Sequence, residues 1–219
     1  MNYNKTKQKV LDGLGFRAQG HVYTLNGTRI LSVTQVIDPF LPFASLPPEV
    51  RDAVLLRGNL VHQLTAIADA GGDWQDDAIE VKLHGYILAW LAFKRDYCVV
   101  IEECEQRVFH RRYRYAGTFD RVCSLRLPPA KRGHASGAFE ITRALVEIKT
   151  GDLLPQYGLQ TAAYVEAVAD GSGAQILRRV AVQLCDTGLY KIEEHTDPTD
   201  YEAFLAALTM QNWRLRHGY

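Results

Sequence analysis

The sequence predicts a mixed α/β fold in which a central mixed β-sheet is flanked by helices. Apolar residues recur at helical spacing between about residues 48 and 97, strand-like stretches follow to residue 149, and a helix, a hairpin and a last helix complete the chain. Helices before and after a block of strands suit one sheet with helices on its faces. The 219 residues, 47% of them hydrophobic, are enough for a sizeable core.

We therefore expect a single domain over residues 1–219. It divides into an N-terminal lead-in and hairpin (1–30), a helical part (31–97) and a sheet core with a C-terminal helix (98–219). No internal repeat interrupts this order.

The charge balance and the apolar content narrow the classes of function. Lys and Arg together number 25, as do Asp and Glu, so the net charge is zero. This argues against a protein held on nucleic acid mainly by bulk positive charge, but it leaves room for a basic groove beside an acidic metal site. Nothing approaches the roughly 18 consecutive apolar residues of a membrane span. The polar N-terminus lacks the apolar core of a signal peptide, so we expect a cytoplasmic protein with no membrane partner.

The N-terminal part predicts a short hairpin after a polar lead-in over residues 1–16. The stretch 21–30 predicts two strands around the Asn-Gly pair at 26–27, which favours the two-residue turn of a hairpin. Directly after it, Ser32 or Thr34 could cap a helix.

Two amphipathic helices are expected next. The first runs over about 48–70, with a proline in its first turn, where no amide donor is needed, and a Gly-Gly pair at its end. The second runs over about 78–97, and Asp76 or Asp77 could cap it.

The second half of the chain alternates strand and turn signals. Strands are expected over 99–101, 106–110, 115–127 and 139–149. The connector 128–137 is rich in turn formers, which predicts an exposed loop. A helix over 155–169, a hairpin over 176–184 and 189–193, and a helix over 198–216 are expected after them.

Two of these strands carry a pattern suited to metal-assisted chemistry. Asp120 lies on one strand, and Glu147 and Lys149 lie two apart on the next, so the latter two point to the same face. Phosphodiester hydrolysis needs charge neutralised, water deprotonated and a leaving oxygen stabilised, and Mg²⁺ or Mn²⁺ held by a few carboxylates can supply all three. Ile148 points into the core, while its main-chain carbonyl can add a metal oxygen. A Glu-x-Lys on a strand could equally be a solvated face or a cross-strand ion pair.

Other motifs in the sequence support this interpretation of the two strands. In chain order the motifs are Gly117-x-x-Asp120, Glu147-x-Lys149-Thr150-Gly151 and Gln160-x-x-x-Tyr164. This set resembles the motifs of the PD-(D/E)XK nuclease superfamily, in particular its RecB-type branch, and is similar to CRISPR-associated and mitochondrial genome-maintenance exonucleases. The resemblance implies a restriction-endonuclease-like core. It also implies a Mg²⁺- or Mn²⁺-dependent nuclease that hydrolyses DNA, most often an exonuclease acting on ends or single strands in phage or bacterial recombination and repair. Phe119-Asp120 stands where a Pro-Asp pair is common, which the branch tolerates.

The resemblance also implies a set of metal ligands. A histidine follows a glycine on an upstream helix of the branch, and Gly58 and His62 match that spacing. His62 is thereby implied to ligate the metal together with Asp120, Glu147 and the Ile148 carbonyl. Glu105 resembles a further acidic position of these nucleases, although Glu102 and Glu103 are equally acidic.

Other residues are candidates for contact with substrate. In the resemblance, Gln160 and Tyr164, one helical turn apart, orient the active site and touch a phosphate or a base. A buried tyrosine with a polar neighbour would look the same. Arg57, one residue before Gly58, is expected to face the groove, and Thr150 of the second motif is a further candidate for substrate binding. Ser32 and Thr34 resemble a substrate-contacting segment, or they could simply begin a helix.

A basic and aromatic run precedes the first motif. Arginines neutralise phosphates and aromatic rings stack on unpaired bases, so this run could bind DNA. A solvated edge strand would look the same. The candidate substrate-binding residues here are Arg111, Arg112, Tyr113 and Arg114, with Arg107, His110 and Tyr115 beside them. Weaker candidates are Lys131, Arg132 and His134 in the predicted loop, and Arg214, Arg216 and His217 near the C-terminus.

The four cysteines do not form a metal-binding pattern. Cys98, Cys104, Cys123 and Cys185 are separated by 6, 19 and 62 residues, without a Cys-x-x-Cys pair. We expect mostly buried free thiols and no iron–sulfur cluster.

Two further readings stay open. The chain could be a non-catalytic nucleic-acid-binding module, or a structural subunit that keeps the nuclease fold. As a standalone protein or part of a larger assembly, it could form a homo-oligomer or bind a recombination protein.

Overall fold

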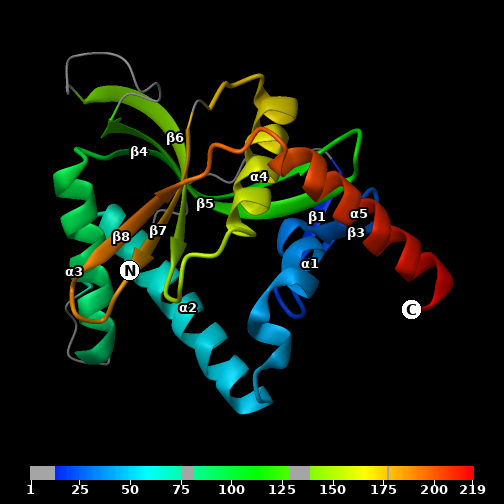
Figure 1. Ribbon diagram of the computed structural model, residues 1–219, viewed down its shortest axis with the longest axis horizontal. Coiled ribbons are helices and arrows are strands. Elements are labelled where there is room, and N and C mark those ends of the chain that lie inside the picture. The colour runs from blue at the N-terminus through cyan, green and yellow to red at the C-terminus, as the bar shows by residue number, and fades with distance from the viewer. Residues whose placement is uncertain (1–12, 75–80, 129–138, 177) are drawn as a thin grey trace.

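The computed structural model describes residues 13–74, 81–128, 139–176 and 178–219. It confirms the predicted fold class, a mixed α/β arrangement of an eight-stranded sheet flanked by helices (Figure 1). Most of the predicted lead-in, the helix caps Asp76 and Asp77 and the loop residues Lys131, Arg132 and His134 lie outside the described residues. The single-domain division stays a prediction.

The N-terminal hairpin forms as predicted, but the lead-in contributes a strand that the prediction missed. The hairpin strands are β2 (Val22–Leu25) and β3 (Thr28–Ser32), joined by an asparagine and a glycine that both have positive φ. β1 (Leu14–Arg17) pairs antiparallel with β2. The prediction of a lead-in through residue 16 was wrong here, because four residues gain a strand only by pairing with β2.

Three helices follow, with short 3-10 turns between the first two. α1 (Val33–Ile37) begins at a capping box formed by Ser32 and Gln35, so Ser32 rather than Thr34 is the cap. The turns are η1 (Asp38–Phe40) and η2 (Pro42–Ser45). α2 (Pro48–Asp69) matches its prediction, and the second predicted helix is described as α3 (Val81–Asp96).

The strand block also follows the prediction, with one difference. β5 (Tyr115–Leu127) and β6 (Glu140–Lys149) match, whereas the two short strands predicted before them form one strand, β4 (Val100–His110). A register shift between Ile101 and Glu103 interrupts the pairing of β4 with β5 without ending the strand.

The last elements are α4 (Tyr157–Ser172), β7 (Arg178–Leu184), β8 (Tyr190–Glu194) and α5 (Asp200–His217). α4 begins two residues after the predicted Pro155 and ends at Gly173, which has a left-handed φ of 66°.

The sheet is mixed because two of its pairings are parallel. Its order is β1-β2-β3-β5-β6-β7-β8, and β4 pairs with β5 beside this path. β3 runs parallel to β5, and β6 runs parallel to β7, with α4 as the crossover between them. The other pairs are antiparallel.

Two main cores cover the two faces. One packs α2 and α3 against side chains such as Val146 and Ile148, and the other packs α1, α4 and α5 against side chains such as Leu145 and Val122. Because Leu145 and Val146 are adjacent on β6, they point to opposite faces. The functional candidates on β5 and β6 therefore lie between two helical layers. None of the described helices has the length and apolarity needed to cross a membrane.

Candidate metal and active site

Three neighbouring strands bring three carboxylates together. The β4–β5 register places Glu105 level with Asp120, between the Cys104–Arg121 pair and the next pair along. On the other side, Asp120 lies one position beyond the last β5–β6 pair, and its N–H donates to Oε1 of Glu147 at 3.3 Å. Residues directly opposite on adjacent strands have neighbouring side chains, so the acidic group follows from strand register.

His62 of α2 completes this group. Its Nδ1 lies 3.2 Å from Oδ1 of Asp120 and 3.6 Å from Oε1 of Glu105. One ligand atom from each of the three residues lies within 4.8 Å of the others, so they can hold a metal ion. Of the three glutamates on β4, Glu105 is thus the one that reaches His62. Glu102 and Glu103 pair with Arg143 instead.

Gly58, the glycine of the predicted Gly58/His62 pair, lies one turn before His62 on α2. A Cβ built at this glycine would lie 3.9 Å from Oγ1 of Thr150, an ordinary contact. The structure therefore does not require glycine there for space.

Ile148 holds Asp120 through its backbone. Its N–H donates to Oδ2 of Asp120 at 2.6 Å, which leaves Oδ1 directed to His62. The N–H and C=O of one strand residue point to the same side, so the Ile148 carbonyl faces the same gap. Its role as a metal ligand stays a prediction.

Lys149 and Gln160 surround the buried Glu147. Lys149 Nζ lies 3.3 Å from Oε2 of Glu147 and 2.9 Å from Oε1 of Gln160, while Gln160 Nε2 donates to Oε2 of Glu147 at 3.1 Å. Glu147 is 1% exposed, so these contacts replace the water that its carboxylate would otherwise bind. Tyr157 adds its ring 4.4 Å below Nζ of Lys149.

Tyr164 explains the glycine of the first motif. A Cβ built on Gly117 would lie 2.5 Å from Cε1 of Tyr164, closer than real Cβ contacts. Glycine is therefore required here, because the buried tyrosine ring covers the backbone of β5.

The charges of the site shift its pKa values in different directions. Burial opposes the charged form of Asp120, but the charge and hydrogen bond of His62, with Lys149 and a backbone amide, outweigh it and lower the pKa of Asp120 to about 2. Burial and the charge of Asp120 raise the pKa of Glu147 to about 8. Burial would lower the pKa of His62, yet Asp120 and Glu105 together raise it to about 10. His62 and Glu147 therefore hold a proton more tightly than free side chains do, whereas Asp120 releases its proton more readily.

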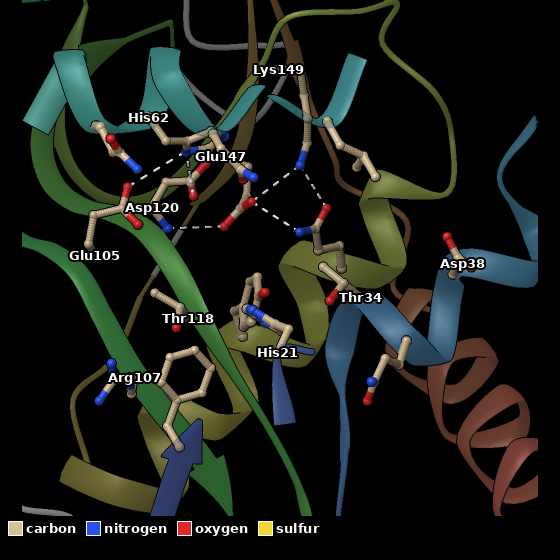
Figure 2. Close-up of a pocket in the computed structure, with 17 residues that line it drawn as sticks. His21, Thr34, Asp38, His62, Glu105, Arg107, Thr118, Asp120, Glu147 and Lys149 are labelled. Carbon is tan, nitrogen blue, oxygen red and sulfur yellow. Dashed lines mark hydrogen bonds and ion pairs between the residues drawn. The ribbon is translucent and has the colours of Figure 1, made fainter. Parts of the chain in front are cut away.

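These side chains lie on the wall of one cleft of about 890 Å³ (Figure 2). Of the predicted candidates, those that line it are Thr34, His62, Glu105, Arg107, Asp120, Glu147, Lys149, Gln160 and Tyr164. The structure thus gathers most of the predicted catalytic and metal-binding residues in one concave site.

The other substrate candidates lie beside or outside the cleft lining. Arg57 donates to the Thr150 carbonyl at 3.3 Å, so these two residues contact each other, and neither lines the cleft. Ser32 is fully buried as the cap of α1, although its hydroxyl lies 3.0 Å from that of Thr34, which does line the cleft.

Arg107 of the predicted basic run lines the cleft, whereas the part of the run at the β4–β5 turn lies away from the cleft lining. Arg111 pairs with Asp170 of α4, Arg112 lies over the ring of Tyr113, and Tyr113 packs edge-on to Tyr201 of α5. This part of the run therefore faces the α4–α5 side of the molecule. Arg114, which has a left-handed φ of 53°, belongs to the same turn. Contact of these residues with DNA stays a prediction.

Sequence reasoning missed two features of the site. Phe16 and His21, which were not predicted, line the cleft beside the predicted candidate Arg107. They belong to the predicted lead-in and the start of the hairpin, and only their aromatic character could have indicated them. Arg121 is fully buried and donates to Glu105 at 2.8 Å, although the motif next to it drew attention only to Asp120.

The cysteines are free thiols and differ in exposure. Cys98 is exposed, Cys104 and Cys185 are half-buried and Cys123 is buried. Burial raises the pKa of Cys104 to about 11 and that of Cys123 to about 12, so both stay protonated at neutral pH. The expectation of mostly buried thiols therefore holds fully for Cys123 alone.

Comparison with known proteins leaves the family open. No family model matches the chain, and no curated protein matches it. Among solved structures, the crystal structure of an alkaline exonuclease from Laribacter hongkongensis is similar at 14% sequence identity, over 86% of this chain and 92% of that one, with a TM-score of 0.32. At these values, the likeness supports no conclusion about a shared site or activity.

Proposed function

We propose that this protein is a divalent-metal-dependent nuclease that hydrolyses phosphodiester bonds of DNA. The observation that carries the proposal is the convergence of Asp120, Glu147 and Lys149 with His62 and Glu105 in a single cleft. Four segments far apart in the sequence supply these residues. A chance Glu-x-Lys on a solvated strand would not need such partners.

The donor set fits a magnesium or manganese ion. His62, Glu105 and Asp120 would hold it, with Glu147 and the Ile148 carbonyl beside them. Carboxylate and carbonyl oxygens suit both ions, while an imidazole ligand favours manganese over magnesium. When bound, such an ion neutralises phosphate charge and activates water.

The residues of the chain have separate roles in this proposal. Lys149, held by Gln160, places a positive charge beside Glu147 and hydrogen-bonds the attacking water or a phosphate oxygen. The ring of Tyr164 packs against the backbone of β5 at Gly117. Gln160, one helical turn before Tyr164, holds both Lys149 and the carboxylate of Glu147 through hydrogen bonds. The preorganised contacts reduce the reorganisation needed at the moment of reaction.

The motif resemblance adds the finer part of the proposal, an exonuclease that acts on DNA ends or single strands in recombination or repair. The competing candidate is a nucleic-acid-binding or structural subunit without catalysis. The complete set Asp120, Glu147 and Lys149 favours the enzyme, because a fold kept only for binding has no need of a buried lysine between a carboxylate and an amide.

The test is cleavage of end-labelled linear DNA by purified protein. We expect degradation with Mg²⁺ or Mn²⁺ and none with a chelator. Asp120→Asn and Lys149→Met should abolish it. The matched surface variants Asp52→Asn on α2 and Lys191→Met on β8, both exposed, should keep full activity. Metal-dependent activity that survives in Asp120→Asn would refute the site.

A second substrate separates the modes of attack. Covalently closed circular DNA offers no end, so an exonuclease should leave it intact while it degrades the linear form. Equal rates on both forms would instead indicate an endonuclease.

A further inference from the structure

A second group of side chains lines the same cleft next to the acidic group, and the proposed chemistry leaves it unused. Phe16 of β1 contacts both His21 of the β1–β2 turn and Arg107 of β4, and all three line the cleft. Thr118 lies between Arg107 and Asp120 (Figure 2). The two aromatic rings and the guanidinium of these residues form one wall of the cleft, and this wall differs in chemistry from the neighbouring acidic group.

The wall is built on a fixed support. The ring centroid of Phe16 lies 4.8 Å from that of Tyr23, and that of His21 lies 5.2 Å from it. Tyr23 is fully buried, and its hydroxyl lies 2.7 Å from Oγ1 of Thr118 on β5. The aromatic side chains are therefore anchored to the same strand that carries Asp120.

Arg107 joins the aromatic pair from the neighbouring strand. Its guanidinium carbon lies 4.1 Å from the ring centroid of Phe16, a stacking distance. Partial desolvation of the ring and, to a smaller extent, the positive charge of Arg107 lower the pKa of His21, which favours the neutral imidazole.

The strand register sets the spacing between the wall and the acidic group. Arg107 pairs with Thr118 across the β4–β5 register, while Glu105 is level with Asp120. The two rows are two residues apart along the strands, about 6.6 Å at the usual rise per residue. That separation suits the step from one phosphate to the adjoining nucleotide.

The chemistry of the wall selects the part of a nucleotide that it can bind. A phosphate is bound by cations and hydrogen-bond donors rather than by aromatic rings, and a sugar offers little flat surface. Aromatic and guanidinium groups stack on the faces of bases, and those faces are covered by neighbours in a duplex but open in a single strand.

We propose that Phe16, His21 and Arg107 form a stacking subsite for an unpaired nucleobase beside the scissile phosphate, so that DNA enters the cleft as a single strand. The inference rests on the proposed nuclease function and narrows its substrate. It also assigns a role to β1, which would otherwise only extend the sheet.

The experiment is an abasic scan of binding. A fluorescent single-stranded DNA, and a series of copies with one abasic residue at each position, are titrated with the protein in EDTA and followed by anisotropy. Removal of the stacked base should weaken binding by the wild-type protein roughly 5- to 150-fold at one or two adjacent positions. Arg107→Gln and His21→Ala should weaken binding of the intact strand and flatten the profile at those positions.

Two further variants complete the design. Phe16→Leu should act like Arg107→Gln, and the exposed His21 provides a test that does not depend on the folding of a core variant. Arg126→Gln removes the same charge from an exposed arginine that lies over the ring of Phe139 outside the cleft lining, and it should keep the wild-type profile.

Each outcome decides the inference. A flat wild-type profile would overturn it, as would a profile that stays unchanged in both Arg107→Gln and His21→Ala. Because binding is measured without metal ions, it is independent of cleavage. A position-specific profile without any metal-dependent cleavage would sink the nuclease proposal and leave the subsite standing, whereas cleavage with a flat profile would do the reverse.

Discussion

Arg121 offers a test of how the site is held together. The side chain is fully buried, and its Nε and one terminal nitrogen lie 2.7 Å from Asp69 and 2.8 Å from Glu105. It also donates to the Thr65 hydroxyl at 3.1 Å and to the Asp120 carbonyl at 2.8 Å. We predict that Arg121→Met lowers both the stability of the fold and the affinity of the site for a metal ion.

The size of the stability effect follows from the partners that remain. Breaking a buried ion pair on one side costs about 3–5 kcal/mol. Asp69 keeps Lys94 at 2.5 Å and the Trp90 indole N–H at 3.0 Å, and Glu105 can turn to water. The loss in the free energy of unfolding should therefore lie near the lower end of this range, at about 3 kcal/mol. For a chain of this length that corresponds to a fall in Tm of roughly 6–12 °C.

The effect on metal affinity has a different cause. Glu105 would lose the contact that orients its carboxylate toward His62, and loss of such a supporting contact typically weakens metal binding about 10- to 100-fold. Urea unfolding measures the change in stability, and a Mn²⁺ titration measures the change in metal affinity.

Arg143→Met is the matched control. Arg143 is partly exposed and pairs with Glu102 and Glu103, which lie on the same strand as Glu105. This control variant should lower the free energy of unfolding by at most about 1 kcal/mol and leave the affinity for Mn²⁺ unchanged. Unaltered Mn²⁺ affinity in folded Arg121→Met protein would refute the positioning role.

Two further predictions follow from the site. Gly117→Ala places a Cβ 2.5 Å from the ring of Tyr164, so it should destabilise the fold by about 1–3 kcal/mol in urea unfolding, while Gly171→Ala, with nothing within 4 Å, should not. Metal binding should release protons, because the pKa values of His62 and Glu147 are raised to about 10 and about 8 and a ligand atom must be unprotonated. Affinity for Mn²⁺ should therefore rise from pH 6 to pH 9, and calorimetry in buffers of different ionisation enthalpy should detect the released protons; pH-independent binding without proton release would contradict the assignment of these ligands.

Much of the fold was predictable from local signals. β5 and the helix at α2 have apolar patterns long enough to set their bounds, and the Asn-Gly pair at 26–27 fixed the first hairpin. β1 was not predictable, because a strand of four residues is stabilised only by its partner β2.

The site was predictable in part for a similar reason. Asp120 and Glu147 stand out through their motifs, but the choice of Glu105 over its acidic neighbours depends on a register shift in β4 that no local pattern reveals. Arg121 has the sequence signature of a surface residue, and its burial depends on Asp69 from a distant helix. Contacts between elements decide such cases, and a single sequence does not display them.

The most direct test of the proposed metal site is the position of a metal ion in a crystal soaked with Mn²⁺. We predict an anomalous peak in the cleft at about 2.0–2.6 Å from Asp120 and from Glu105 or His62, with Glu147 beside it. Absence of a peak in the cleft of a protein that cleaves DNA with Mn²⁺, or a peak at other residues, would refute the metal site.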